Sequence, residues 1–134
     1  MHKDTYIQAL IKEQAFFEIH QEEVLGSSME VFKNRPRSLV DFLELSANHG
    51  EQPYLIYQGQ TISFAEHLAL VKKVAYILQH EYGVEPGDRV AIYAANCPHW
   101  IIFFWATVSI GGIACGLNGW WKGSEALKAI EDAN

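Results

Sequence analysis

An apolar run constrains this sequence more than any other feature. It extends from Trp100 to Leu117 without one charged side chain, and this length approaches that of a transmembrane helix. Two consecutive glycines at positions 111 and 112 interrupt the run, and no Lys or Arg stands immediately beside either end. The residues before the glycines allow a helix of about fourteen residues, roughly 21 Å long, whereas a membrane core is about 30 Å thick. We therefore expect a buried helix and no transmembrane segment.

The segments that flank this helix have the length and composition of buried strands. Residues 89–94 are mostly apolar, Asn96 can cap a helix over 97–110, and Pro98 lies in the first turn, where a missing amide costs little. Residues 113–117 then supply a second strand. Strand, helix and strand in this order predict a parallel βαβ unit. Parallel sheets are normally covered on both faces and have more strands than this sequence supplies, so we expect an incomplete sheet.

Turn and cap residues predict the elements that come before this unit. Ser38 can cap a short amphipathic helix that ends at Gly50, and residues 54–64 form two β-prone runs around a turn at Gly59. These patterns predict a helix followed by a β-hairpin.

A long amphipathic helix is predicted after the hairpin. Ser63 and Glu66 have the spacing of a capping box, and Gly83 can end the helix in the left-handed conformation. The apolar stripe consists of Phe64, Leu68, Val71, Ala75, Leu78 and Tyr82.

The two ends of the chain are simpler. Asp4 can cap a first helix that fades before Gly26, and a loop follows to Arg37. Ser124 can cap a last helix before Asn134. We therefore divide the chain into an N-terminal helix and loop, residues 1–37, and an αβ segment, residues 38–134.

Composition and charge argue against several classes of partner and site. The chain has 134 residues with 49% hydrophobic and 19% charged content, as in a globular protein, and its net charge of −6 argues against nucleic acid or an anionic membrane surface as partner. The first residues lack a secretory signal pattern, so we expect a cytoplasmic protein. Its two cysteines, Cys97 and Cys115, lack zinc-site spacing, and we expect no metal site.

Four stretches match known motifs in order and spacing. Thr-Ile-Ser-Phe-Ala-Glu at 61–66 resembles Thr-Tyr-x-Glu-Leu, with His67 at the leucine position, and Val-Glu-Pro-Gly-Asp-Arg-Val-Ala at 84–91 resembles Gly-Val-x-x-Gly-Asp-Arg-Val-Ala. Residues 110–118 resemble a Gly-Ala-x-x-x-Pro-Leu-Asn strand, with Gly116 where proline is common. Asn-Gly-Trp-Trp-Lys-Gly-Ser-Glu at 118–125 resembles Asn-x-Trp-Trp-x-Gly-x-Glu. These motifs are those of the adenylate-forming superfamily, and the last variant resembles fatty-acyl-CoA and related ligases.

This resemblance implies an α/β fold and an activity. The chain resembles the N-terminal portion of the large, AMP-binding domain of an acyl-CoA synthetase. Such an enzyme joins a fatty acid to ATP, with Mg²⁺, to give an acyl-adenylate and pyrophosphate, and then transfers the acyl group to coenzyme A. Two alternatives remain open. The acid could be an aryl, steroid-like or amino acid, or the chain could be a stand-alone αβ module that binds a partner and has no catalytic role.

The resemblance also implies what the 134-residue chain lacks. The family's Ser/Thr/Gly-rich phosphate loop has no counterpart here, and the glycines of 111–116 fit neither Gly-x-Gly-x-x-Gly nor the Walker pattern. We therefore expect an inactive fragment with no catalytic, cofactor-binding or metal residue. ATP, Mg²⁺ and coenzyme A would be bound by the full-length enzyme.

Four side chains are candidates for a substrate pocket or an interface. Trp120 and Trp121 could line the acyl pocket, contact another subunit or simply pack into a core. His99 and Trp100 open the apolar helix, where a packing or capping role competes with a functional one. Apolar surface around residues 97–117 would also favour association, so a homo-oligomer is possible.

Overall fold

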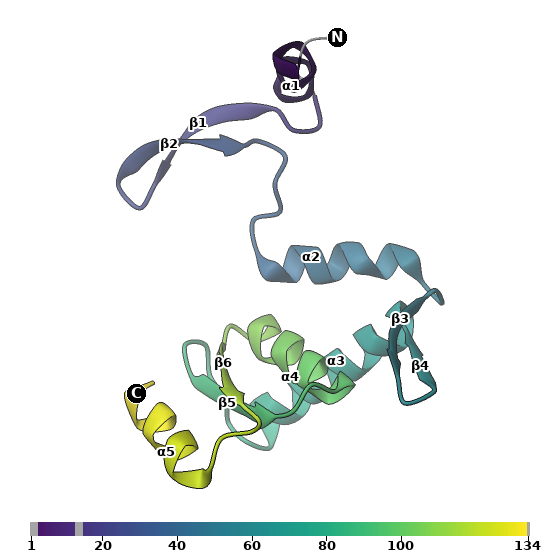
Figure 1. The fold of residues 1–134 in the computed structure, drawn as a ribbon, viewed down its shortest axis with the longest axis vertical. Helices are drawn as coiled ribbons and strands as arrows, with labels where there is room; N and C mark the ends of the chain where they lie inside the picture. The colour runs from purple at the N-terminus through teal and green to yellow at the C-terminus, as the bar shows by residue number, and fades with distance from the viewer. Residues whose placement is uncertain (1–2, 13–14, 134) are drawn as a thin grey trace. The chain divides into compact units, whose positions relative to one another are not determined.

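The computed structural model describes residues 3–12 and 15–133, and it divides the chain into two compact units, Met1–Arg37 and Ser38–Asn134. Figure 1 shows the elements of both units. The α/β class is confirmed, and among the described residues each of three sheets has two strands. The first unit contains α1 (Lys3–Ile11), β1 (Ile19–Val24) and β2 (Ser27–Phe32).

The first unit contains a hairpin that the sequence analysis missed. β1 and β2 pair antiparallel where a fading helix and a loop were expected, and Asp4 lies in the first turn of α1. Leu25 and Gly26 make the turn with φ values of 51° and 79°, as a two-residue type I′ turn requires. Leucine is an unusual residue at such a φ, and this is why the turn was not recognised.

Ion pairs hold the segment after β2 against β1. Lys33 Nζ lies 2.7 Å from the Glu18 carboxylate, and the Glu22 carboxylate lies 3.0 Å from Arg35 and 2.9 Å from Arg37. The two arginines lower the pKa of Glu22, against a smaller effect of burial. The basic segment that follows β2 is therefore attached to the hairpin by ion pairs.

The second unit has the order of elements that the sequence predicts. Ser38 caps its first helix through a hydrogen bond from the Asp41 amide, 3.1 Å long, and Ser63 receives an equal bond from Glu66 at the start of its longest helix. The predicted Ser38 cap and the predicted Ser63–Glu66 capping box are confirmed, and Ser38 also forms a capping box with Asp41. The elements are α2 (Leu39–Ser46), the 3₁₀ helix η1 (Ala47–His49), β3 (Pro53–Tyr57), β4 (Gln60–Ser63), α3 (Phe64–His80), β5 (Arg89–Ala94), α4 (Pro98–Ser109), β6 (Ile113–Asn118) and α5 (Gly123–Asp132).

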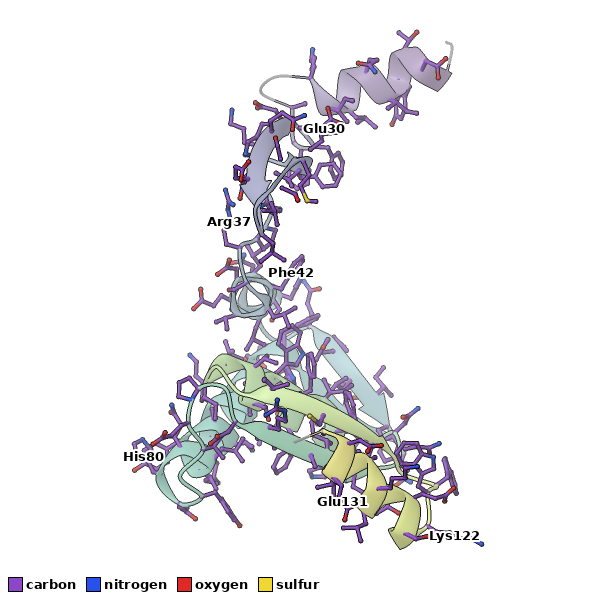
Figure 2. All side chains as sticks on the ribbon, turned by 90° about the vertical axis from the view of Figure 1, so that its left-hand side faces the viewer. Glu30, Arg37, Phe42, His80, Lys122 and Glu131 are labelled. Carbon is purple, nitrogen blue, oxygen red and sulfur yellow. The ribbon has the colours of Figure 1, made fainter. Side chains whose placement is uncertain are left out.

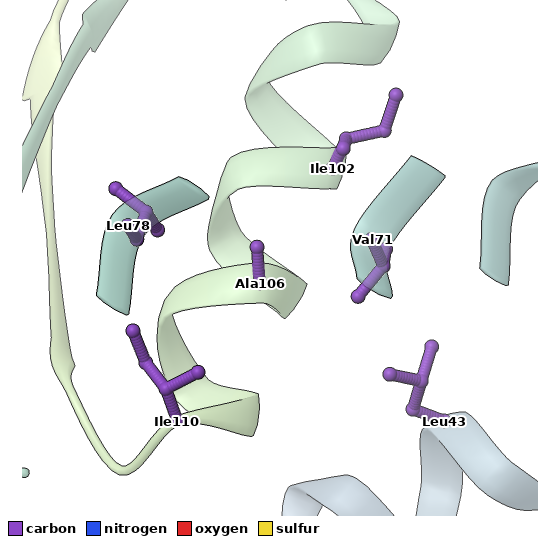
Figure 3. Close-up of a cluster of buried hydrophobic side chains, with 6 residues drawn as sticks. All are labelled: Leu43, Val71, Leu78, Ile102, Ala106 and Ile110. Atoms are coloured by element: carbon purple, nitrogen blue, oxygen red, sulfur yellow. The ribbon is translucent and has the colours of Figure 1, made fainter. Parts of the chain in front are cut away.

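Three helices of this unit enclose its core. α3 packs along α4, and α2 lies against α4. Figure 3 shows the buried apolar side chains that these helices bring together. They are Leu43 from α2, Val71 and Leu78 from α3, and Ile102, Ala106 and Ile110 at the end or along α4.

The apolar run is a helix and a strand, as predicted. α4 has 12 residues, about 18 Å at 1.5 Å per residue, and within the described ranges no helix is long and apolar enough to cross a membrane. Two hydroxyls inside α4 are satisfied by the helix itself, since Thr107 and Ser109 donate to carbonyls four residues earlier. Gly111 then turns the chain with a φ of 80°.

The strands on either side of α4 pair in parallel. Their register runs from Arg89 opposite Ile113 to Ala94 opposite Asn118. α4 packs on both strands, and α5 lies near β6. Because neighbouring side chains of a strand point to opposite faces, Gly116 faces α4 while Cys115 borders a small cavity with α5. The predicted βαβ unit is therefore confirmed.

Three predicted helix caps are wrong: Asp4 lies inside the first turn of α1, and the caps of α4 and α5 differ by one or two residues. The cap residue of α4 is Cys97, whose side chain makes no capping bond, and not Asn96. α5 begins at Gly123 with Lys122 as the cap residue, and the Lys122 amide donates to the Glu125 carboxylate at 2.8 Å. Ser124 lies inside the first turn. Lys122 and Glu131 mark the two ends of this helix in Figure 2.

Candidate functional site

The carboxyl ends of β5 and β6 lie beside each other at one edge of the parallel pair. Ala94 and Asn118 form the last residue pair, and the chain leaves both strands at this edge. In open parallel sheets, ligands bind outside the carboxyl ends of the strands. A cavity of about 630 Å³ opens here. Its lining residues are Tyr57, Ala94, Ala95, Asn96, Trp100, Gly116, Leu117, Asn118, Gly119 and Trp120. We call this cavity the strand-end groove.

Trp100 forms one wall of the strand-end groove. It lies in the first turn of α4, and its indole is stacked on Phe104 with ring centroids 5.9 Å apart and planes at 9°. A Cβ built at Gly116 would be 3.1 Å from its Cζ2 atom. The indole can therefore lie over β6 because residue 116 has no side chain.

The loop after β6 is held by four contacts. The Asn118 side-chain oxygen accepts from the Trp120 amide at 3.0 Å, and the Asn118 carbonyl accepts from the Trp121 amide at 3.0 Å. The Tyr93 hydroxyl donates to the Trp121 carbonyl. Gly119 lies so close to β5 that a Cβ there would be 2.7 Å from the Ala94 carbonyl oxygen. This fixed loop presents the Trp120 side chain, which is 87% exposed, at the rim of the groove.

Tyr57 connects the groove to two further cavities of about 380 Å³ each. One adjoins the groove through Tyr57, Asn96 and Trp100 and continues along β3 and the start of α4. The other lies between the β3–β4 hairpin, α3 and α4, and His99 lines it. Tyr57 was not singled out from the sequence, because only the folded position of the β3–β4 hairpin brings it to these cavities.

The structure therefore separates the four candidate side chains. Trp100 and Trp120 share the strand-end groove, whereas His99 is exposed on the other side of the α4 start. Trp121 is not among the lining residues of the groove, and its contribution is the carbonyl that accepts from Tyr93.

The chemistry of the groove is that of a binding surface. Its polar side chains are the amides of Asn96 and Asn118 and the hydroxyl of Tyr57, among otherwise apolar or aromatic residues. Within residues 3–12 and 15–133, no group of three or more His, Cys, Asp or Glu is placed to hold a metal ion. Such a lining can enclose an apolar or planar group and orient it with amide hydrogen bonds.

Comparisons with known proteins agree on one family. The model of the family described as AMP-binding enzyme matches residues 42–134, more than half of the chain. The chain is 27% identical over 105 residues to a long-chain-fatty-acid–CoA ligase of Escherichia coli O6:H1, covering 78% of this chain and 19% of that protein. It is 42% identical over 69 residues to acetyl-coenzyme A synthetase 2 of Candida glabrata, covering 47% and 10%.

A solved structure supports the fold. The unliganded O-succinylbenzoate coenzyme A synthetase (MenE) from Bacillus subtilis has a TM-score of 0.64 and 32% sequence identity, and the match covers 69% of this chain and 20% of that one. Matches to the curated relatives named above span less than a fifth of their length.

Proposed function

The chain belongs to the AMP-binding enzyme family, and we propose that it forms the N-terminal part of the large domain of a fatty-acyl-CoA ligase. In this reaction the carboxylate attacks the α-phosphorus of ATP, giving an acyl-adenylate and pyrophosphate. The thiol of coenzyme A then attacks the acyl carbonyl and releases AMP. The family match over residues 42–134 is the observation that carries the proposal.

The choice of a fatty acid has two supports. One is the name of the E. coli relative, which covers 78% of the chain. The other is the Asn-Gly-Trp-Trp sequence at 118–121, which places an exposed indole at the rim of an apolar groove. The proposal assigns Trp100 and Trp120 to the wall of the substrate pocket. A cytoplasmic location is part of the same proposal.

An aryl acid is the second candidate substrate. It is favoured by the 32% identity to the MenE structure, whose name specifies O-succinylbenzoate. The planar Trp100 ring beside Gly116 would suit an aromatic acid as well as an acyl chain. A comparison of kcat/KM for fatty and aryl acids therefore decides between the two candidates.

Mg²⁺ would supply charge neutralisation on the ATP phosphates. The described part of the chain offers no cluster of metal-ligating side chains, and its strand-end groove is lined by amides and aromatic rings. These residues do not fit a metal site. We therefore assign this segment to substrate contact and to the scaffold.

The test uses the whole protein that carries this segment. It is incubated with ATP, Mg²⁺ and coenzyme A and a panel of acids, namely acetate, decanoate, palmitate, benzoate and O-succinylbenzoate, and thioester and AMP are measured. The proposal predicts equal amounts of both products and the highest kcat/KM with a fatty acid. Preference for an aryl acid would support the second candidate, and the absence of thioester with every acid would refute the ligase assignment.

Trp120→Ala tests the pocket wall. We expect it to reduce kcat/KM for palmitate by about tenfold or more and to leave acetate nearly unchanged, because only a long chain would reach the rim. Tyr82→Ala, which removes another highly exposed aromatic ring, is the matched control. If kcat/KM for palmitate is the same in Trp120→Ala and Tyr82→Ala, Trp120 has a role in packing or in an interface.

A further inference from the structure

His67 is a fully buried histidine without a hydrogen-bond partner. His67 is 1% exposed, and neither of its ring nitrogens, Nδ1 and Nε2, has a hydrogen-bond partner among the described residues. One ring nitrogen of a neutral imidazole carries a proton, so at least one buried donor is unsatisfied. Buried polar groups are nearly always hydrogen-bonded, and this exception calls for an explanation.

The position of His67 makes the exception important. It lies one turn into α3, where the first amides of the helix are bound by neighbouring elements. Phe64 N–H donates to the Gln52 carbonyl at 3.1 Å and Ala65 N–H to the Gly50 carbonyl at 2.9 Å. The start of α3 is thus the junction at which η1, the β3–β4 hairpin and the helix meet.

Aromatic rings surround this junction. The Tyr54 ring from β3 contacts His67 edge to face, with centroids 4.7 Å apart, and it also packs on Phe64 at 4.5 Å. Phe64 in turn contacts the His49 ring from η1 at 4.6 Å. A neutral imidazole fits among these rings as an apolar side chain would.

The charged and titratable groups near the junction offer His67 no anion. Glu66 is bound to the Ser63 amide at 2.8 Å, and Glu51 accepts from the Ser63 hydroxyl at 3.2 Å. Tyr54 of β3 and His49 of η1 are the titratable residues of the aromatic cluster, and neither carries a carboxylate. His99 of α4 is exposed. In the described ranges no carboxylate forms an ion pair with His67.

We propose that His67 makes the second unit acid-labile, because its protonation places an unpaired cation inside the junction and opens the packing of the hairpin against α3. Burial lowers the pKa of His67 below its ordinary value of 6.5. The unfolded chain therefore takes up the proton first as the pH falls below 6.5, and folding loses its advantage from that pH downward to the folded pKa. Above 6.5 the histidine is neutral in both states and contributes no pH dependence.

The experiment measures urea unfolding of the whole 134-residue chain at pH 7.5, 6.5, 5.5 and 4.5. Wild type is compared with His67→Leu and with His80→Leu, which changes the exposed histidine at the end of the same helix (Figure 2). Relative to His67→Leu, the folded-to-unfolded ratio of wild type should fall by up to about tenfold for each pH unit below 6.5. His80→Leu should follow wild type. Parallel pH profiles of wild type and His67→Leu would overturn the proposal.

An NMR titration of the wild-type histidines decides the question if His67→Leu does not fold. The ring signals of His67 in the folded chain should keep their neutral shifts at pH 6.5, while signals of the unfolded chain increase at lower pH. Titration of folded His67 with a midpoint at or above 6.5, without unfolding, would also refute the proposal.

Discussion

The Trp100 indole lies directly over Gly116 of the neighbouring strand, with 3.1 Å between its Cζ2 atom and the position of a Cβ at residue 116. This contact joins α4 to β6 at the edge where both strands end. It also shapes the strand-end groove, because both residues line it.

Gly116→Val should displace the Trp100 ring. A branched side chain would collide with an indole that is already stacked on Phe104, and overpacking of this kind costs about 1–3 kcal/mol of unfolding free energy. We expect a changed near-UV circular dichroism spectrum and a lower urea midpoint. Gly123→Val is the control, since a Cβ at Gly123 meets no atom within 4 Å. Unchanged tryptophan signals in Gly116→Val would show that the contact is absent.

Gly119→Ala should destabilise the loop after β6. A Cβ at this position meets the backbone of Ala94 and Ala95, which no rotamer change can move away. Because the strands must separate to admit the methyl group, the loss of stability should be at least about 1–3 kcal/mol. Urea unfolding of Gly119→Ala and Gly123→Ala measures the difference. If both variants unfold at the wild-type midpoint, the close approach of the two strand ends is incorrect.

Ser63→Ala should remove the cap of α3. The serine hydroxyl accepts from the Glu66 amide and donates to the Glu51 carboxylate, and the residue is buried. The free energy of unfolding should therefore fall by about 0.5–2 kcal/mol. Thermal unfolding provides the measurement. Ser46→Ala, at the end of α2, removes a hydroxyl that donates to the Leu43 carbonyl and should have a smaller effect. A larger loss in Ser46→Ala would contradict the assigned role of Ser63.

The isolated 134-residue chain should not catalyse ATP–pyrophosphate exchange with any fatty acid. Its groove is lined by amides and aromatic rings, and its sequence contains no Ser/Thr/Gly-rich phosphate loop. Exchange of radiolabelled pyrophosphate into ATP is the assay, with the whole protein as positive control. Acid-dependent exchange above background by the isolated chain would show that it contains a complete adenylation site.

Local signals explain why most of the second unit could be predicted from sequence. The capping serines 38 and 63, and the glycines at 59 and 111, fix helix starts and turns through bonds and dihedral angles within a few residues. The β1–β2 hairpin lacked such signals. Apolar and polar residues do not alternate along β1, and leucine occupies a turn position that favours asparagine or glycine.

The groove and the buried histidine depend on tertiary packing. Tyr57 lines the groove only because the fold brings the end of β3 to this edge of the sheet. His67 is buried at the start of α3, where the Tyr54 ring of β3 contacts it. The sequence pattern does not distinguish Tyr57 from an exposed residue. His67 lies three residues after Phe64 and four before Val71, so helical spacing places it on the apolar face, but not without a hydrogen-bond partner. Self-association of the chain stays a prediction, which sedimentation over a range of concentrations would measure.

The central claim is that the apolar run from Trp100 to Leu117 is a helix followed by a strand that pairs in parallel with residues 89–94. NMR measurement of backbone contacts in the isotopically labelled chain tests this most directly. The claim predicts cross-strand contacts in the register of Val90 opposite Ala114 and Ile92 opposite Gly116, and an end of helical contacts at Gly111. Helical contacts that continue through Gly111 and Gly112, without any contact between residues 89–94 and 113–118, would contradict it.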